Sequence, residues 1–294
     1  MNYSVGYLGP KGTFTQKAVD ALFPDEQVKS YQTIPLCMDA VKFGHVKYGV
    51  VPIENTLEGT VNMTLDYLIA SKTLKVVSEI VVPVEQHFMV DPNNRDRWKE
   101  TDTIYSHPHA LAQCHTFLSN EMKNVSVEPF TSTAAAAKHV SDYPERSIGA
   151  IANDLAAKEY GLEIIRRNVE DVTNNHTRFV VIHKNDTALR VKSMPIQGFK
   201  TTFMIALPTD HAGALHQVLS AFAWRRINLS KIESRPMKTG LGHYYFLIDV
   251  QQKMDDILIP NTVAEIEAIG CQVEILGSYP QYSLDALTEQ DLDS

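Results

Sequence analysis

The first half of the chain alternates between two hydrophobic patterns. Short runs rich in β-branched residues predict strands at residues 3–8, 48–53, 74–83, 103–105, 126–130, 147–152 and 177–183. Between them, apolar residues at helical spacing predict helices at residues 15–22, 60–70, 109–118, 133–140 and 153–160. Gly161 follows the last of these helices and is a good left-handed stop. Strands that alternate with helices predict an α/β fold with mostly parallel strands.

The second half follows a different order after a break in the pattern. Residues 184–198 combine mixed charge, a proline and a glycine with no hydrophobic period, which is typical of a linker. A strand, a helix, two strands, a helix and a strand are then predicted at residues 200–207, 212–226, 229–234, 243–250, 255–269 and 271–276. This is the βαββαβ order of ferredoxin-like domains, a topology that hosts many functions.

Composition narrows the classes of function. A chain of 294 residues is long enough for two domains, and 44% apolar with 21% charged residues is typical of a globular protein. The 27 basic and 35 acidic side chains give a net charge of −8. An acidic surface repels phosphate backbones and anionic lipids, so we expect neither nucleic acid nor a membrane as partner.

The cysteines and the N-terminus indicate the compartment. Cys37, Cys114 and Cys271 are widely spaced and odd in number, which fits a reducing cytoplasm. The N-terminus lacks a basic region followed by a long apolar stretch, so no secretory signal is expected. The longest apolar runs, such as residues 80–84, are far shorter than the roughly 18 residues that span a bilayer. We therefore expect a cytoplasmic protein.

Two polar clusters place free backbone N–H groups at the start of a predicted helix. One is the glycine turn at residues 9–15, and the other is residues 131–133, before four alanines. Both can hold an anion such as a carboxylate, while a plain turn and simple helix capping are the alternatives. The glycine turn lacks the spacing of dinucleotide and P-loop sites, so a nucleotide site is not supported.

Two further clusters place polar side chains at buried strands. Glu54 and Asn55 follow the apolar run 50–53, with Thr60 as an expected helix N-cap nearby. Arg178 enters the apolar strand at residues 177–183. A buried arginine is costly unless it pairs with a protein carboxylate or with a ligand, so both clusters are candidates for function.

A fifth cluster gathers three histidines and a cysteine within residues 106–115. His109 and Gln113 fall one turn apart on the predicted helix, and no carboxylate lies nearby in the sequence, so a metal site is not favoured. Cys114 and His115 are adjacent helical residues that do not face each other, which argues against a nucleophile pair.

Taken in order, these clusters resemble monofunctional prephenate dehydratase, an enzyme of phenylalanine biosynthesis, with its C-terminal ACT regulatory domain. The resemblance covers nearly the whole chain and rests on motifs at residues 9–14, 52–59, 64–66, 106–108, 113–114, 175–179, 213–215 and 233–236. His109 stands where many relatives of that family carry a glutamine, and Thr56 stands where a serine is common.

The resemblance implies a domain organisation. A catalytic domain at residues 1–185 would be similar to type 2 periplasmic binding proteins, with the substrate in a cleft between two lobes. Lobe one would comprise about residues 1–80 and 171–185, and lobe two about residues 81–170. A linker at residues 186–198, an ACT regulatory domain at residues 199–280 and an acidic tail at residues 281–294 would follow.

The resemblance also implies a reaction without metal or cofactor, in which prephenate loses CO2 and water to give phenylpyruvate. Aromatisation drives the reaction, and a donor must assist the departing hydroxide. Thr177 would be that positioned donor, and the implied catalytic residues are Thr177, Arg178, Asn55, Glu54, Ser106 and Gln113. The implied substrate-binding residues are Gly12, Thr13, Phe14, Thr131, Ser132, Thr133 and Phe179.

In the ACT domain the resemblance implies feedback inhibition by L-phenylalanine, bound between two subunits of a homodimer or of a dimer of dimers. The implied effector residues are Gly213, Ala214, Leu215, His216, Asn228, Leu229, Ser230, Glu233, Ser234, Arg235 and Pro236. Three alternatives stay open: an arogenate dehydratase with the same chemistry, a small-molecule-binding protein without catalysis, and a purely regulatory ACT protein.

Overall fold

The computed structural model describes residues 4–192, 194–208, 211–236 and 244–285. The chain divides into two compact units, the first formed by residues 1–64 and 81–179 and the second by residues 65–80 and 180–294. The first residues of the strands expected at 3–8 and 243–250, and most of the expected acidic tail, lie outside the described residues. The domain limits expected from the sequence stay a prediction.

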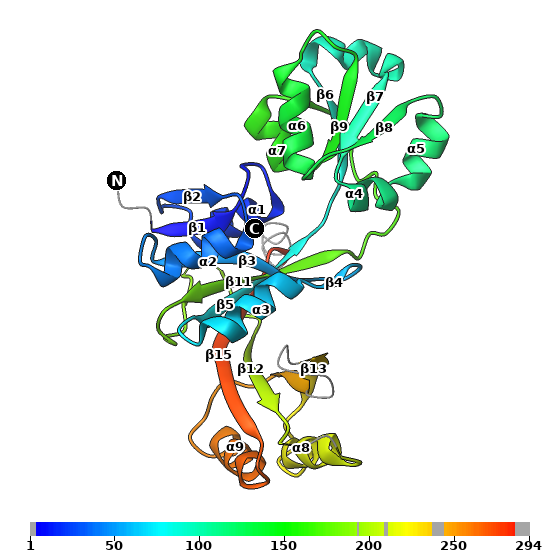
Figure 1. Ribbon diagram of the computed structural model, residues 1–294. Helices are drawn as coiled ribbons and strands as arrows, with labels where there is room; N and C mark the ends of the chain where they lie inside the picture. The colour runs from blue at the N-terminus through cyan, green and yellow to red at the C-terminus, as the bar shows by residue number, and fades with distance from the viewer. Residues whose placement is uncertain (1–3, 193, 209–210, 237–243, 286–294) are drawn as a thin grey trace. The chain divides into compact units, whose positions relative to one another are not determined.

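The first sheet of unit one follows the order β11-β3-β1-β2. Its strands are β1 (Val5–Leu8), β2 (Val28–Tyr31), β3 (Tyr48–Asn55) and β11 (His176–His183). β1 pairs in parallel with both β2 and β3, as the α/β pattern predicts, and the short β4 (Gly59–Thr60) pairs antiparallel with β3. Helices α1 (Phe14–Leu22) and α2 (Ile34–Lys42) pack against these strands (Figure 1).

The second sheet of unit one is mixed rather than parallel, in the order β10-β6-β9-β7-β8. Its strands are β6 (His87–Val90), β7 (Thr103–Ser106), β8 (Ser126–Pro129), β9 (Ile148–Ala152) and β10 (Glu163–Arg166). β7 pairs in parallel with β8 and β9, whereas β6 pairs antiparallel with β9 and β10. The accompanying helices are η1 (Pro92–Glu100), α4 (Pro108–Gln113), α5 (His115–Glu121), α6 (Thr133–Asp142) and α7 (Asp154–Tyr160).

Both faces of the second sheet are covered. Met89 and Ala150 pack in one apolar cluster with α6 and α7, while Phe88 and Ile151 pack in another with Phe117 of α5. Figure 1 shows α6 and α7 on one side of this sheet and α5 on the other. A strand with two buried faces shows no alternation of apolar and polar residues, which explains why β6 was not among the predicted strands.

Local sequence signals set the helix starts of unit one. The side chains of Thr13, Ser132 and Asn153 cap α1, α6 and α7 by accepting hydrogen bonds from backbone N–H groups. Gly161 ends α7 in the left-handed conformation, with φ of 67°, as expected. The helix expected at residues 109–118 is instead two helices, because the backbone leaves helical geometry at buried Cys114.

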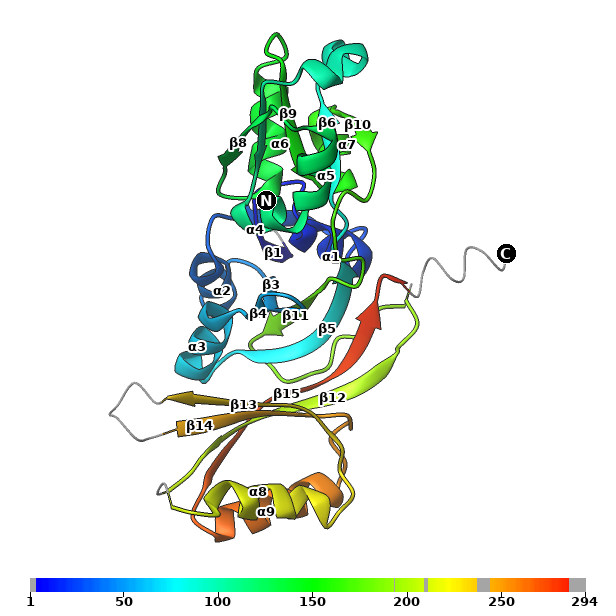
Figure 2. The same ribbon diagram turned by 90° about the vertical axis from the view of Figure 1, so that its right-hand side faces the viewer.

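Unit two contains the predicted βαββαβ order, which is confirmed. Its strands are β12 (Gly198–Ala206), β13 (Leu229–Pro236), β14 (Tyr244–Val250) and β15 (Gln272–Ser283), and its helices are α8 (Ala214–Ala223) and α9 (Leu258–Ala268). The sheet order is β13-β14-β12-β15, continued by β5 (Lys75–Pro83), and the helix α3 (Asn62–Ser71) precedes β5. Figures 1 and 2 both place α8 and α9 together on one face of this sheet, where Phe203, Phe222 and Ile266 form part of the core.

Unit two also buries an ionic cluster. Lys200 Nζ lies 2.8 Å and 3.0 Å from the two carboxylate oxygens of Glu79, and 3.8 Å from Asp249 Oδ2. Gln281 Nε2 donates to Glu79 Oε1 at 2.9 Å. Lys200 is only 5% exposed and Glu79 is fully buried, so the ammonium group holds strands β12, β5 and β14 together in a site of low dielectric constant.

Candidate active site

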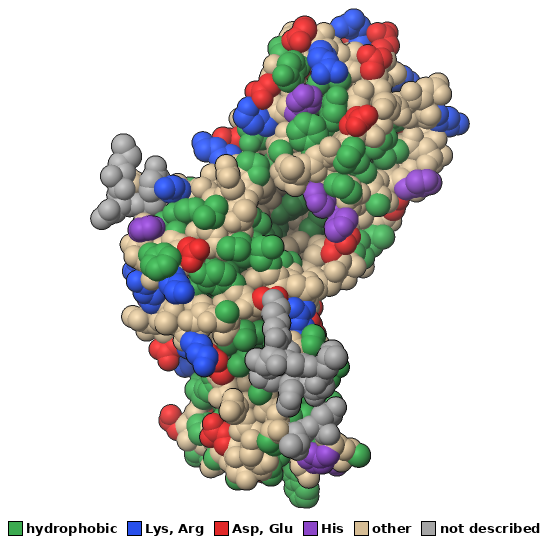
Figure 3. Space-filling model, in the orientation of Figure 1, with side chains coloured by type: hydrophobic (Ala, Val, Ile, Leu, Met, Phe, Trp, Pro, Cys, Tyr) green, Lys and Arg blue, Asp and Glu red, His purple; other side chains and the backbone are tan. Residues whose placement is uncertain are grey.

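A cavity of about 310 Å³ opens in unit one. Its walls come from strands β3 and β11, from the starts of α1, α4 and α6, and from the segment after β5. Figure 3 shows a hollow on one face of the molecule with histidine side chains at its edge. The lining residues are Thr13, Phe14, Thr15, Pro52, Asn55, Glu58, Val84, Gln86, His107, His109, Ala110, Gln113, Thr131, Ser132, Thr133, Asn175, Thr177 and Phe179.

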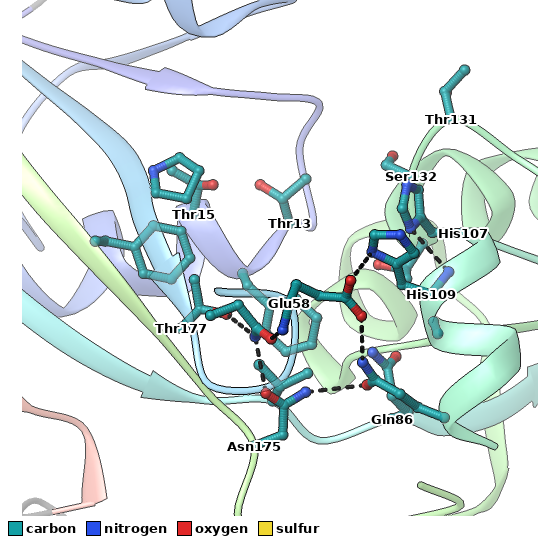
Figure 4. A pocket seen from close by; sticks show the side chains of 18 residues that line it. Thr13, Thr15, Glu58, Gln86, His107, His109, Thr131, Ser132, Asn175 and Thr177 are labelled. Carbon is teal, nitrogen blue, oxygen red and sulfur yellow. Dashed lines mark hydrogen bonds and ion pairs between the residues drawn. The ribbon is translucent and has the colours of Figure 1, made fainter. Parts of the chain in front are cut away.

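Asn55 is the centre of a hydrogen-bond network in this cavity. Its Nδ2 atom donates to Thr177 Oγ1 and to Asn175 Oδ1, both at 2.9 Å, while its Oδ1 atom accepts from the backbone N–H of Leu57 and Glu58 at 3.0 Å. Asn175 Nδ2 in turn donates to Gln113 Oε1 at 3.1 Å (Figure 4). Because Thr177 Oγ1 accepts from Asn55, its own hydroxyl proton is available for a different acceptor.

Two helix starts border the cavity. Thr13 and Phe14 belong to the start of α1, and Ser132 and Thr133 to the start of α6. The N-terminus of a helix carries a partial positive charge and presents backbone N–H groups, so both starts favour a carboxylate nearby. The lining itself includes neither lysine nor arginine among the residues that the structure describes.

The titratable groups of the described lining are Glu58, His107 and His109. Glu58 Oε2 lies 3.1 Å from His109 Nδ1, and Gln113 Nε2 lies 3.5 Å from Glu58 Oε1 (Figure 4). His107 caps α4 by accepting from the backbone N–H of His109, and the two imidazole rings meet edge to face at 4.9 Å. Burial, followed by the nearby His109, lowers the pKa of His107, so His107 is neutral at pH 7.

Most of the expected site residues lie on this cavity. Asn55, Gln113, Thr177 and Phe179 come from the motifs of β3, α4 and β11. The remaining members are the expected binding residues at the two helix starts, namely Thr13, Phe14, Thr131, Ser132 and Thr133. Residues that stand 120 or more positions apart in the chain, such as Asn55 and Thr177, are thus direct neighbours.

Four expected site residues lie elsewhere. Arg178 Nη1 donates to Glu54 Oε2 at 2.5 Å, so this arginine has the protein carboxylate that its burial requires. Strand alternation directs Arg178 away from the face that carries Thr177 and Phe179. Ser106 is fully buried and donates to the backbone carbonyl of Ile151 at 2.6 Å.

Gly12, the fourth, packs against α7 with φ of +77°. A Cβ atom there would lie 3.0 Å from Ala156 Cα, so Gly12 permits a close backbone approach instead of lining the cavity.

Several lining residues were not among the expected site residues. His107, His109, Glu58 and Thr15 stand inside the quoted clusters, and the Asn175 side chain begins the motif of Thr177, so proximity in sequence was an available signal. Val84 and Gln86 follow β5 without any motif. Thr60 lies in β4 and α3 begins at Asn62, so the interpretation of Thr60 as a helix N-cap was wrong.

The expected effector residues lie at two places in unit two. Gly213 precedes α8 with φ of 90° and no side-chain cap, and Ala214, Leu215 and His216 form the first turn. Residues 228–236 lie just before and within β13, at the edge of the sheet as far as the structure describes it. Arg235 Nη2 lies 3.0 Å from Asp66 Oδ1 of α3, and Pro236 lines a second cavity of about 460 Å³.

The described part of the chain offers neither a cysteine nucleophile nor a metal site. Cys37, Cys114 and Cys271 are all free and buried, and burial raises the pKa of Cys114 to about 12, which removes it as a nucleophile. Among the residues that the structure describes, no group of three or more His, Cys, Asp or Glu side chains could hold a metal ion. None of the described helices is long and apolar enough to cross a membrane.

Comparison with known proteins decides the family. The profile named prephenate dehydratase matches residues 5–187. The chain belongs to the prephenate dehydratase family. The prephenate dehydratase of Bacillus subtilis (strain 168) is 52% identical over 284 residues, which cover 95% of this chain and 99% of that protein. The expected recognition and enzyme class, a hydro-lyase of phenylalanine biosynthesis, are therefore confirmed.

Solved structures agree on the fold. Prephenate dehydratase from Arthrobacter aurescens, in complex with L-Phe, is 31% identical with a TM-score of 0.81 and covers 94% of this chain and 89% of its own. The structure of GqqA, described as a novel type of quorum quenching acylase, is 28% identical with a TM-score of 0.82 and covers 94% of this chain and 97% of its own. These two structures share one fold but are described with different activities. A likeness in fold alone therefore does not identify the reaction, which has to be argued from the residues of the site.

Proposed function

We propose that the cavity of unit one is where prephenate binds and loses its hydroxyl and its ring carboxylate. The observation that carries this proposal is the hydrogen bond from Asn55 Nδ2 to Thr177 Oγ1 at 2.9 Å. It orients the threonine hydroxyl as a donor, and hydroxide is a poor leaving group that requires one. Thr177 acts as a positioned donor, since a threonine hydroxyl by itself is a very weak acid.

The helix starts at α1 and α6 account for the recognition of the substrate side-chain carboxylate. Thr13 and Ser132 fix the first turns of these helices, whose backbone N–H groups suit an anion. The ring carboxylate, which must leave as CO2, would be slowed by tight cationic contacts, because only interactions stronger in the transition state accelerate a reaction. Apolar Phe14, Phe179 and Val84 provide weakly polar surroundings for it.

The same cavity favours prephenate over arogenate. Arogenate carries an ammonium group where prephenate carries a keto group, and an ammonium group binds best beside a carboxylate. Glu58 is the carboxylate of the described lining, and it is engaged with His109 at 3.1 Å. Assays of both substrates side by side are expected to give a higher kcat/KM with prephenate, and a preference for arogenate would contradict this assignment.

The purified chain is expected to release phenylpyruvate from prephenate, and a chelator should leave the rate unchanged. The reason is that proton donation and aromatisation need no metal, and the helix starts of α1 and α6 offer backbone N–H donors for the side-chain carboxylate. The measurement is the rate of phenylpyruvate formation with and without EDTA. Loss of activity that zinc restores would reassign His107 and His109 as metal ligands, and absence of product would overturn the proposal.

For unit two we infer that L-phenylalanine binds at the start of α8 and at β13, between two copies of the chain, and inhibits the enzyme. The uncapped helix start at Gly213 suits an amino-acid carboxylate. The edge position of β13 suits a second copy, and Ile232 on this strand is 45% exposed. The related enzyme from Arthrobacter aurescens was solved with L-Phe, which supports this effector. A homodimer or a dimer of dimers follows.

Ser234→Trp is expected to weaken inhibition by L-phenylalanine without lowering the basal rate. Ser234 is exposed on β13, so an indole there would obstruct the effector site while leaving the core intact. A coupling free energy of about 1–3 kcal/mol is typical, so the half-inhibiting concentration should rise roughly tenfold or more. Ser126→Trp, at an exposed position on β8, is the control and should be inhibited like the unmodified chain.

If Ser234→Trp is inhibited as strongly as the control, the effector binds elsewhere and the ACT assignment fails. Point variants are preferred to removal of the ACT domain, because Lys200 of β12 neutralises buried Glu79 of β5. The domain limits at residues 1–185, 186–198, 199–280 and 281–294 are retained as part of this proposal. A cytoplasmic location also belongs to this proposal, and it is supported by the three cysteines, which form no disulfide.

A further inference from the structure

The proposed reaction consumes one proton per turnover. When prephenate, a dianion, breaks the bond to its ring carboxylate, the electron pair enters the ring and CO2 leaves. The C–O bond then breaks towards the hydroxyl oxygen, which takes up a proton and leaves as water, and phenylpyruvate remains as a monoanion. The inference below rests on this reaction at this cavity, and it concerns the source of that proton.

Few side chains of the described cavity lining could supply this proton. The titratable groups of this lining are Glu58, His107 and His109. The pKa of His107 is lowered by burial, and His107 Nδ1 is occupied by the backbone N–H of His109 at 3.4 Å. A neutral imidazole is a far weaker acid than an imidazolium, so His107 is an unsuitable proton donor.

His109 and Glu58 form an oriented couple. His109 Nδ1 lies 3.1 Å from Glu58 Oε2, and the Glu58 backbone is fixed because its N–H donates to Asn55 Oδ1 at 3.0 Å. Gln113 Nε2 contacts the other carboxylate oxygen of Glu58 at 3.5 Å. Among the interactions of the described residues, the second ring nitrogen, His109 Nε2, has no hydrogen-bond partner in the protein.

This arrangement has a known chemical consequence. A carboxylate that accepts from Nδ1–H fixes the tautomer and the orientation of an imidazole, and leaves Nε2 to exchange a proton with a substrate. The couple also has an electrostatic role: a carboxylate that faces a dianionic substrate is unfavourable unless a cation compensates it, and a protonated His109 supplies that charge.

We propose that His109 is a catalytic residue that delivers the proton from Nε2 to the departing hydroxyl, and that Glu58 is the residue that positions it. Thr177 then orients the hydroxyl while His109 neutralises it, and the proton returns to His109 from solvent through its exposed side. The His109 side chain is 57% exposed, so this return path is open.

The groups that face His109 come from three elements. Glu58 lies on the turn between β3 and β4, His107 lies at the start of α4, and the uncharged Thr131 and Ser132 lie at the start of α6. The imidazolium form of His109 is the proton donor in this proposal, so kcat should fall as the pH is raised.

The test measures kcat and KM for prephenate from about pH 5 to pH 9, with enzyme-free blanks, for the unmodified chain and three variants. His109→Gln should lower kcat by about 100-fold at neutral pH, with little change in KM, and should abolish the fall at high pH. Glu58→Gln should move that fall to lower pH, because the neutral amide no longer favours the imidazolium. His115→Gln, at an exposed position outside the lining, is the matched control and should behave like the unmodified chain.

Two results would overturn the inference. If His109→Gln raises KM while kcat and its pH dependence stay unchanged, His109 only binds the substrate anion. If His109→Gln matches the control in both constants, the couple has no role in the reaction. In either case the unmodified chain still converts prephenate, whereas failure of the unmodified chain to do so would overturn the proposed function itself.

Discussion

Replacing Thr177 with alanine is expected to lower kcat for prephenate by about 10²–10³-fold, the effect of removing one positioned donor from a developing negative charge. Asn55 Nδ2 donates to Thr177 Oγ1, so the hydroxyl is already oriented before the substrate arrives. The interaction strengthens as the C–O bond breaks, and KM should therefore change little. Steady-state kinetics with prephenate measures both constants.

Two companion variants separate the hydroxyl group from the space it fills. Thr177→Val preserves the volume and removes the hydroxyl, so its kcat should fall as far as that of Thr177→Ala. Thr177→Ser preserves the hydroxyl and should retain much more activity. Circular dichroism should show the same fold for all three, because Thr177 lies at the cavity surface. A Thr177→Val variant with an unchanged kcat would remove this residue from the mechanism.

The largest effect on stability is expected from Lys200→Met in unit two. The substitution removes the ammonium group that contacts fully buried Glu79 at 2.8 Å and Asp249 at 3.8 Å. Breaking a buried ion pair by removal of one partner typically costs about 3–5 kcal/mol, because the other charge stays in a medium of low dielectric constant. The midpoint of urea denaturation, followed by circular dichroism, measures this loss.

Two variants make this prediction specific. Lys184→Met removes an exposed lysine and should change the unfolding free energy by less than about 0.5 kcal/mol. Glu79→Met combined with Lys200→Met removes the nearer of the two carboxylates that Lys200 contacts and should be more stable than Lys200→Met alone. Equal midpoints for Lys200→Met and Lys184→Met would show that the buried pair contributes nothing.

The sequence predicts those parts of the fold that are set by local signals. The side chains of Thr13, Ser132 and Asn153 start helices where capping residues are expected, and Gly161 ends one. Strands β2, β6 and β10 were missed: β6 is buried on both faces, and β2 and β10 are partly exposed without an alternation of buried and exposed residues. β6 pairs antiparallel with β9, and β10 pairs antiparallel with β6, and no local pattern records these long-range pairings.

The site is predictable in its motifs but not in the direction of its side chains. Motif residues 54–55 and 177–178 were expected to act together, yet Asn55 and Thr177 lie on the cavity while Glu54 pairs with Arg178. Successive strand residues point to opposite faces, so a contiguous motif is divided between two environments. Gln86 reaches the cavity only through the path of the chain after β5, which the sequence alone does not specify.

The central claim is that the cavity of unit one is the place where prephenate reacts, and a crystal structure of the Thr177→Ala variant with bound prephenate tests it most directly. The account predicts the ring among Asn55, Gln113 and Phe179, with its side-chain carboxylate at the start of α1 or α6. The ring hydroxyl should lie close enough to position 177 for a threonine hydroxyl to reach it, at about 2.6–3.2 Å. Prephenate bound outside this cavity, or with its hydroxyl directed away from position 177, would contradict the account.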